Sequence, residues 1–137
     1  MKRAIFDTVA AMLGGLGAFL FGEMSGIFSV LIALTVLDYA TGVIAAIINK
    51  NLSSRVGFNG IFKKIMVFVV IAVANLICVY VVDSNGFLRS AVIFFFVANE
   101  SISILENAGS MGVPVPNKLL EMLEQIKTKN KSESDGE

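Results

Sequence analysis

The sequence contains no histidine, no tryptophan, one cysteine and two prolines among 137 residues. The lack of histidine removes the commonest general base and metal ligand. A single cysteine, Cys78, excludes a framework of intramolecular disulfides, and its position inside an apolar run is typical of a small buried residue. We therefore expect that the chain is not an enzyme and that it uses no metal or other cofactor.

Charged residues are also scarce. They make up 16% of the chain, against about 25% in average proteins. The 11 basic residues balance the 11 acidic ones, so no overall basic field favours nucleic acid as a partner. Hydrophobic residues make up 55% and the mean hydropathy is +0.78. This composition indicates a small integral membrane protein.

Four apolar runs predict transmembrane helices and hence an all-α fold. They cover about residues 4–22, 26–48, 62–82 and 87–110, and together form a membrane domain over 1–110. Segment 111–127 is expected to be a proline-containing link and a short amphipathic helix, because Leu119, Met122, Leu123 and Ile126 recur at helical spacing. Residues 128–137 are charged and are predicted to be a disordered tail.

Asp38 lies in the middle of the run from Gly26 to Ile48, which carries no other charge. At ~1.5 Å per residue the run spans ~34 Å, enough to cross a hydrocarbon core of ~30 Å. An ionisable group at that depth costs ~2.5–3.5 kcal/mol and normally faces protein or water. Two interpretations stay open. Asp38 either forms hydrogen bonds to a neighbouring helix or serves an ion pathway or assembly.

Small residues recur every four positions in the first run. Ala10, Gly14, Ala18 and Gly22 share one helical face, where a second backbone can approach closely. This pattern predicts helix packing, either within one chain or between chains. Gly42 is a further packing candidate, on the small or polar face of the second run.

The second half of the fourth run is polar. Asn99, Ser103 and Glu106 fall on one stripe, and Glu100 and Asn107 lie beside it. Such a stripe implies water or a polar partner within the membrane. The alternative is that the helix leaves the membrane near Asn99. The full set of intramembrane polar or pore-lining candidates is Asp38, Thr41, Asn75, Asn99, Glu100, Ser103, Glu106 and Asn107.

Basic residues gather at the two ends and between the second and third runs. Lys50, Arg55, Lys63 and Lys64 of that loop are expected to contact anionic headgroups. By the positive-inside rule the distribution predicts four spans with both termini in the cytoplasm. The alternative is three spans, with the first run lying on the membrane surface and the amino terminus outside.

Three sequence blocks, in this order, resemble a known family. They are Asp-Tyr-Ala-Thr-Gly at 38–42, Leu-Ser-Ser-Arg-Val-Gly-Phe-Asn-Gly-Ile at 52–61 leading to Lys-Lys-Ile at 63–65, and Asn-Glu-Ser-Ile-Ser-Ile-Leu-Glu-Asn-Ala-Gly at 99–109 continuing to Gly-Val-Pro-Val-Pro at 112–116. With these blocks the chain is similar to the toxin secretion/phage lysis holins of Gram-positive bacteria and their phages.

The resemblance implies a protein of the bacterial cytoplasmic membrane that accumulates, forms homo-oligomers and opens a large lesion. Through the lesion a cell-wall hydrolase (endolysin) is released, or in some relatives a large toxin. The resemblance implies no catalytic residues, and lipid is the expected surrounding partner. Two other functions stay open: a small proton- or cation-coupled transporter that uses Asp38 or Glu100, and an accessory subunit of another membrane complex.

Overall fold

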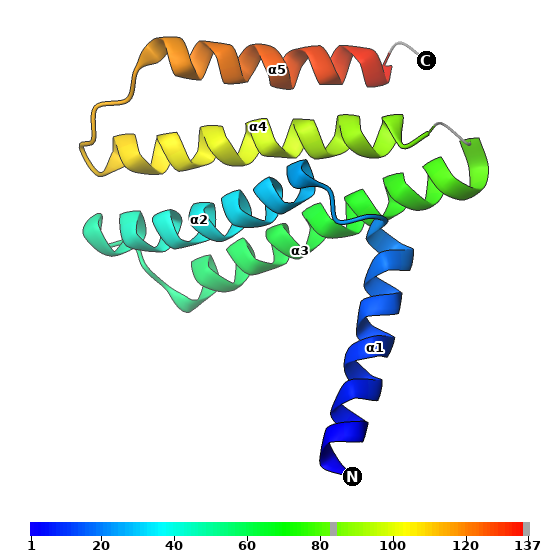
Figure 1. Ribbon diagram of the computed structural model, residues 1–137. Helices are drawn as coiled ribbons and strands as arrows, with labels where there is room; N and C mark the ends of the chain where they lie inside the picture. Colours follow the sequence, from blue (N-terminus) through cyan, green and yellow to red (C-terminus); the bar gives the residue numbers. More distant parts are fainter. Residues whose placement is uncertain (83–84, 136–137) are drawn as a thin grey trace.

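The computed structural model describes residues 1–82 and 85–135, and its regular structure in this part of the chain is helical. The prediction of an all-α fold is confirmed. The elements are α1 (Lys2–Phe21), α2 (Gly26–Ile48), α3 (Ser54–Ile77), its π-helical continuation η1 (Cys78–Val82), α4 (Phe87–Ser110) and α5 (Asn117–Asp135), shown in Figure 1.

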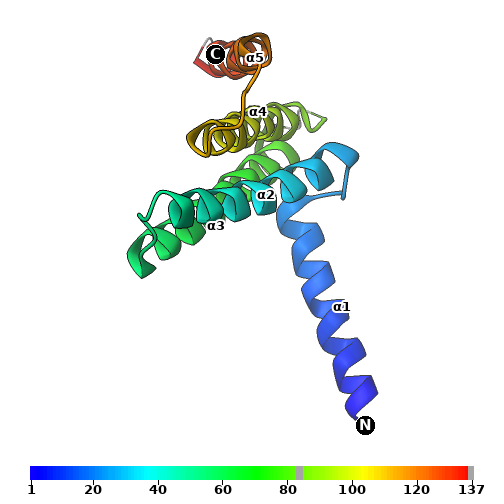
Figure 2. The same cartoon turned by 90° about the vertical axis from the view of Figure 1, so that its left-hand side faces the viewer.

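Helices α2, α3 and α4 pack side by side into one bundle, and α1 leaves that bundle at a steep angle (Figures 1 and 2). The core of the bundle contains Phe28 and Leu31 of α2, Ile71 of α3 and Ile93 of α4, all buried. No residue of α1 is buried. The first helix therefore adds little to the core of a single chain.

Four helical segments are long and apolar enough to cross a membrane: Lys2–Phe21, Gly26–Ile48, Ser54–Val82 and Phe87–Ser110. The third begins earlier than the predicted start near residue 62, because Ser53 caps it. The Ser53 hydroxyl oxygen accepts a hydrogen bond from the Val56 amide at 3.3 Å, which satisfies one of the free donors at a helix start. Much of the expected basic loop is thus the first part of α3.

Helix α5 lies along α4 (Figures 1 and 2) and continues through Asp135, whereas the sequence predicted disorder from residue 128. The segment contains two lysines and a glutamate, which are good helix formers, so it can extend a helix that has already started. The Thr128 hydroxyl also donates to the Glu124 carbonyl oxygen at 2.9 Å. The prediction of disorder for 136–137 lies outside the described residues.

Candidate functional site

The carboxylates of Asp38 on α2 and Glu100 on α4 meet at the ammonium group of Lys64 on α3. The Lys64 Nζ donates to Asp38 Oδ2 and to Glu100 Oε2. The side chains are 7% exposed for Asp38, 2% for Glu100 and 20% for Lys64. One residue from each helix of the bundle thus forms an ion cluster inside the segments that are apolar enough to span a membrane.

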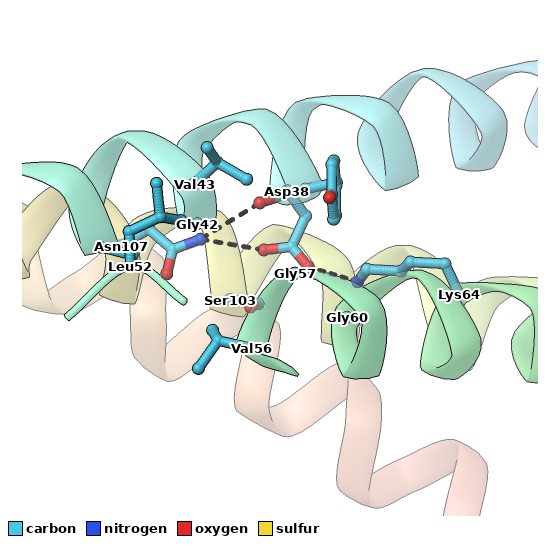
Figure 3. Close-up of a pocket in the computed structure, with 12 residues that line it drawn as sticks. Asp38, Gly42, Val43, Leu52, Val56, Gly57, Gly60, Lys64, Ser103 and Asn107 are labelled. Atoms are coloured by element: carbon cyan, nitrogen blue, oxygen red, sulfur yellow. Dashed lines mark hydrogen bonds and ion pairs between the residues drawn. The ribbon is translucent and has the colours of Figure 1, made fainter. Parts of the chain in front are cut away.

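Asn107 of α4 holds the Asp38 side of this cluster. Its Nδ2 donates to Asp38 Oδ1 at 3.1 Å (Figure 3). It also donates to the Thr41 hydroxyl oxygen at 3.1 Å. Gly42 faces Asn107, since a Cβ at that position would lie 3.5 Å from the Asn107 Nδ2, an ordinary van der Waals contact. Gly42 therefore contributes to packing between α2 and α4, and Asp38 does form hydrogen bonds to a neighbouring helix.

A cavity of about 180 Å³ lies against the cluster. Asp38, Lys64, Ser103 and Asn107 form its polar wall, and Leu52 lies in the loop that joins α2 to α3 (Figure 3). The remaining lining is mainly apolar or glycine: Tyr39, Gly42, Val43, Ala46, Val56, Gly57 and Gly60. The cavity therefore extends from the ion cluster towards that loop.

The polar residues that α4 turns towards α2 differ partly from the predicted stripe. Glu100 is buried and Asn107 donates a hydrogen bond to Asp38. Ser103, which lies between them in the sequence, lines the cavity. Asn99 is half-buried and Glu106 is exposed. Positions 100, 103 and 107 share one helical face, so the face in contact is rotated by about one position from the stripe through 99, 103 and 106.

Lys64 requires a correction. The sequence predicted that it contacts headgroups, but its ammonium group is directed inward to Asp38 and Glu100. The reason is that α3 starts well before Lys64, which places this lysine beside the carboxylates of two neighbouring helices. Lys50, Arg55 and Lys63 are exposed, and their contact with headgroups stays a prediction.

Asn75 lies apart from the ion cluster and binds the end of α1. Its Nδ2 donates to the carbonyl oxygens of Phe19 at 3.3 Å and Leu20 at 3.1 Å. Gly22 follows with a φ of +76°, and a Cβ there would lie 2.6 Å from the Asn75 Oδ1. Glycine therefore permits both the backbone conformation and the close approach at this junction.

Arg89 is a residue that the sequence did not single out. It is 9% exposed, donates from Nη2 to the Glu23 carbonyl oxygen at 2.8 Å and lies 5.4 Å from the ring centre of Phe28. The sequence feature that could have predicted its role is its position as a lone basic residue at the start of an apolar run. Such a charge near a membrane face needs a partner, and the carbonyl groups after α1 provide one.

The small-residue face of α1 has no partner within the described part of the chain over most of its length. Ala10, Gly14 and Ala18 are exposed, and no atom lies within 4 Å of a Cβ built at Gly14, Gly15 or Gly17. Gly22, at the end of the predicted ladder, is the member that contacts the bundle. Packing of α1 within one chain is thus confined to its last turn.

The fold and the cluster define a multi-span helical membrane protein with a buried ion cluster. The chain belongs to the Bacteriophage holin family, which it matches over residues 15–128. Proteins of this family are generally not enzymes.

Several relatives match this chain over most of their length, and one of them is described as a probable holin. A probable holin of Bacillus phage phi105 is 38% identical over 120 residues, which cover 86% of this chain and 87% of the phage protein. An uncharacterised protein of Halalkalibacterium halodurans is 38% identical over 129 residues, covering 91% and 96% of the two chains. One of Listeria monocytogenes is 41% identical over 110 residues, covering 80% and 78%. No solved structure matches the chain.

Proposed function

We propose that this protein acts as a holin: it accumulates in the bacterial cytoplasmic membrane, assembles into homo-oligomers and opens a lesion that releases a cell-wall hydrolase or a toxin. The observation that carries the proposal is the match to the holin family over residues 15–128. A relative named as a probable holin, from Bacillus phage phi105, supports it.

The dimensions of one chain support assembly from many copies. The polar cavity beside the ion cluster has a volume of about 180 Å³, which holds a few water molecules at ~30 Å³ each. A folded hydrolase is far larger than that. Any opening that passes such a protein must therefore lie between chains, with several copies around it.

Helix α1 supplies a surface for contact between copies. Ala10, Gly14 and Ala18 are exposed along one face, and small residues let two membrane helices approach closely. Lipid offers no hydrophobic gain for helix association, so close packing and hydrogen bonds must supply it. We assign this face to contacts with a second copy of the chain.

The ion cluster supports a two-state mechanism. In the single chain Lys64 pairs with both Asp38 and Glu100, and all three side chains are largely hidden from the bundle surface, so the bundle can stay in lipid. If the helices separate around a water-filled opening, water satisfies the same groups. The charged groups have polar partners in both the closed and the open state, but lack them in partly separated arrangements. The transition from closed to open should therefore be abrupt.

For the orientation, we propose that both termini lie in the cytoplasm. The exposed basic residues Lys50, just after α2, and Arg55 and Lys63, in the first part of α3, then face anionic lipid on the same side. This arrangement requires α1 to cross the membrane, and hence to turn at Gly22 from the steep angle seen in Figure 1.

The same cluster favours one other function, a proton- or cation-coupled transporter. Buried ionisable groups inside membrane spans commonly mark an ion pathway, and Asp38 and Glu100 are such groups. A transporter keeps the membrane closed to proteins, so the size of what crosses separates the two functions.

Reconstitution into liposomes tests the proposal. Vesicles that contain a small dye and a folded fluorescent protein are prepared with increasing amounts of the full chain. A holin releases both cargoes together once the protein density passes a threshold. Release of neither cargo at any density, or of the dye alone in proportion to density, contradicts the proposal, and the second result favours the transporter.

A further inference from the structure

The ion cluster contains unequal numbers of acidic and basic groups. With every group ionised, the carboxylates of Asp38 and Glu100 and the ammonium of Lys64 sum to a charge of about −1. Taken as whole residues, Asp38 is 6% exposed and Glu100 is 1% exposed. An unbalanced charge at such a position inside a membrane span is costly, so the cluster needs one further positive charge.

The surrounding elements do not supply that charge. Lys63, next to Lys64 on α3, is exposed, and Glu106 of α4 is exposed as well. Tyr39 of α2 is neutral and lies against the glycines of α3. Charged residues of α5 line a different cavity, beside Phe95 on α4: they are Glu124, Lys127 and Lys131. Among the described residues, Lys64 is therefore the cation of this cluster.

The hydrogen bonds distinguish the two carboxyl groups. Both oxygens of Asp38 accept a hydrogen bond, Oδ1 from Asn107 and Oδ2 from Lys64. Glu100 accepts one from Lys64 at Oε2, and its Oε1 has no donor among the described residues. A buried carboxylate oxygen without a donor loses its hydration without compensation. A protonated carboxyl at Glu100 avoids this loss, while Asp38 is well satisfied as the anion.

We propose that the cluster is a binding site for one proton, held by the Glu100 carboxyl beside an ionised Asp38–Lys64 pair. A proton suits the site better than a metal ion, because no group of three or more acidic, cysteine or histidine side chains in the described residues is arranged to hold a metal. The cavity is lined by Asp38 and Lys64 but not by Glu100, so water in it reaches the ionised pair beside the proton site. The proton site does not depend on lesion formation.

Infrared spectroscopy of the full chain in liposomes tests the proposal, since a protonated carboxyl has a C=O absorption that a carboxylate lacks. At neutral pH the native chain should show this band at an intensity of about one carboxyl per chain. Glu100→Gln should abolish it. Asp38→Asn should abolish it too, because Glu100 then becomes the sole carboxylate partner of Lys64 and ionises. Glu106→Gln, an exposed change on the same helix, should leave the band intact.

Several results would overturn the proton site. One is absence of the band from the native chain at neutral pH. Another is a band that persists in Glu100→Gln or Asp38→Asn, with helix content checked by circular dichroism. A third is a native band that disappears on addition of sodium chloride at constant pH, since a metal cation would then replace the proton. None of these infrared measurements depends on liposome leakage. The proton site and the proposed holin function can therefore fail independently of each other.

Discussion

The guanidinium of Arg89 donates from Nε to the carbonyl oxygen of Phe21 at 2.7 Å. This bond joins the start of α4 to the end of α1, which are 68 residues apart in the sequence. Together with the bonds from Asn75, it holds the last turn of α1 against the bundle. The end of α1 is therefore anchored by side chains that belong to α3 and α4.

Replacing Arg89 tests how much this junction contributes. Arg89→Ala removes the bonds to Phe21 and Glu23, and hydrogen bonds to charged groups contribute about 1.5–3 kcal/mol each. We expect the free energy of unfolding in detergent to fall by about 3 kcal/mol, the lower end for two such bonds. Arg89→Lys keeps the charge but cannot reproduce the fork of donors, so its loss should be smaller. Unfolding of Arg89→Ala at the native midpoint would contradict this role.

The second prediction concerns the small-residue face of α1. Gly14→Leu adds a bulky side chain at a position where, among the described residues and apart from the adjoining helix backbone, no atom lies within 4 Å of a Cβ, so the fold of one chain should be unchanged. Contact between copies should weaken, because the two backbones are pushed apart. Gly15→Leu, which also meets no atom, is the matched control on the neighbouring face.

Crosslinking in membranes, followed by gel analysis of oligomer size, measures this effect. Gly14→Leu is expected to form oligomers with fewer copies of the chain than Gly15→Leu. Equal oligomer sizes in the two variants would mean that the four-residue ladder has no role in assembly.

The third prediction concerns Asp38. Asp38→Asn can still accept from Asn107 and leaves Lys64 paired with Glu100, so assembly should be largely retained. Asp38→Leu removes the carboxylate that Lys64 and Asn107 share on α2, while Lys64 keeps Glu100 and Asn107 keeps the Thr41 hydroxyl. The loss should be about 1.5–3 kcal/mol for each lost hydrogen bond to the charged group. Unfolding in detergent measures the difference. Equal losses in the two variants would show that the charge of Asp38, and not its hydrogen bonding, is required.

Much of the fold follows from local sequence. The apolar runs predicted the ranges of α2 and α4, because such long stretches have few alternatives to a membrane helix. The start of α3 was misplaced because hydropathy does not register the Ser53 cap. The length of α5 was underestimated because a charged composition predicts disorder but does not prevent helix extension.

The sequence predicted which residues belong to the site better than it predicted how they are arranged. Asp38, Glu100 and Asn107 stood out because polar groups in membrane spans need partners. Which partners they have depends on how the helices are rotated and on where each begins. Lys64 is the clearest case, since its sequence position beside Lys63 suggested a headgroup contact, and tertiary packing directs it inward.

The fourth prediction concerns topology. Cys78 is replaced by serine, and single cysteines are placed at Ser25, Ser54, Asn85 and Ser132. With both termini in the cytoplasm, an impermeant thiol reagent outside intact cells should label only the cysteines at 25 and 85. Permeabilised cells provide the control that all four sites react. Labelling at 54 or 132 in intact cells would contradict this orientation.

The fifth prediction is the central one, and a time course in bacterial cells tests it most directly. The chain is expressed together with a cytoplasmic cell-wall hydrolase, and membrane potential and culture turbidity are followed as the protein accumulates. We predict that the potential stays constant until a threshold amount is reached, and that it then collapses abruptly as the hydrolase escapes and turbidity falls. A gradual loss of potential in proportion to the amount of protein, without lysis, would contradict the account.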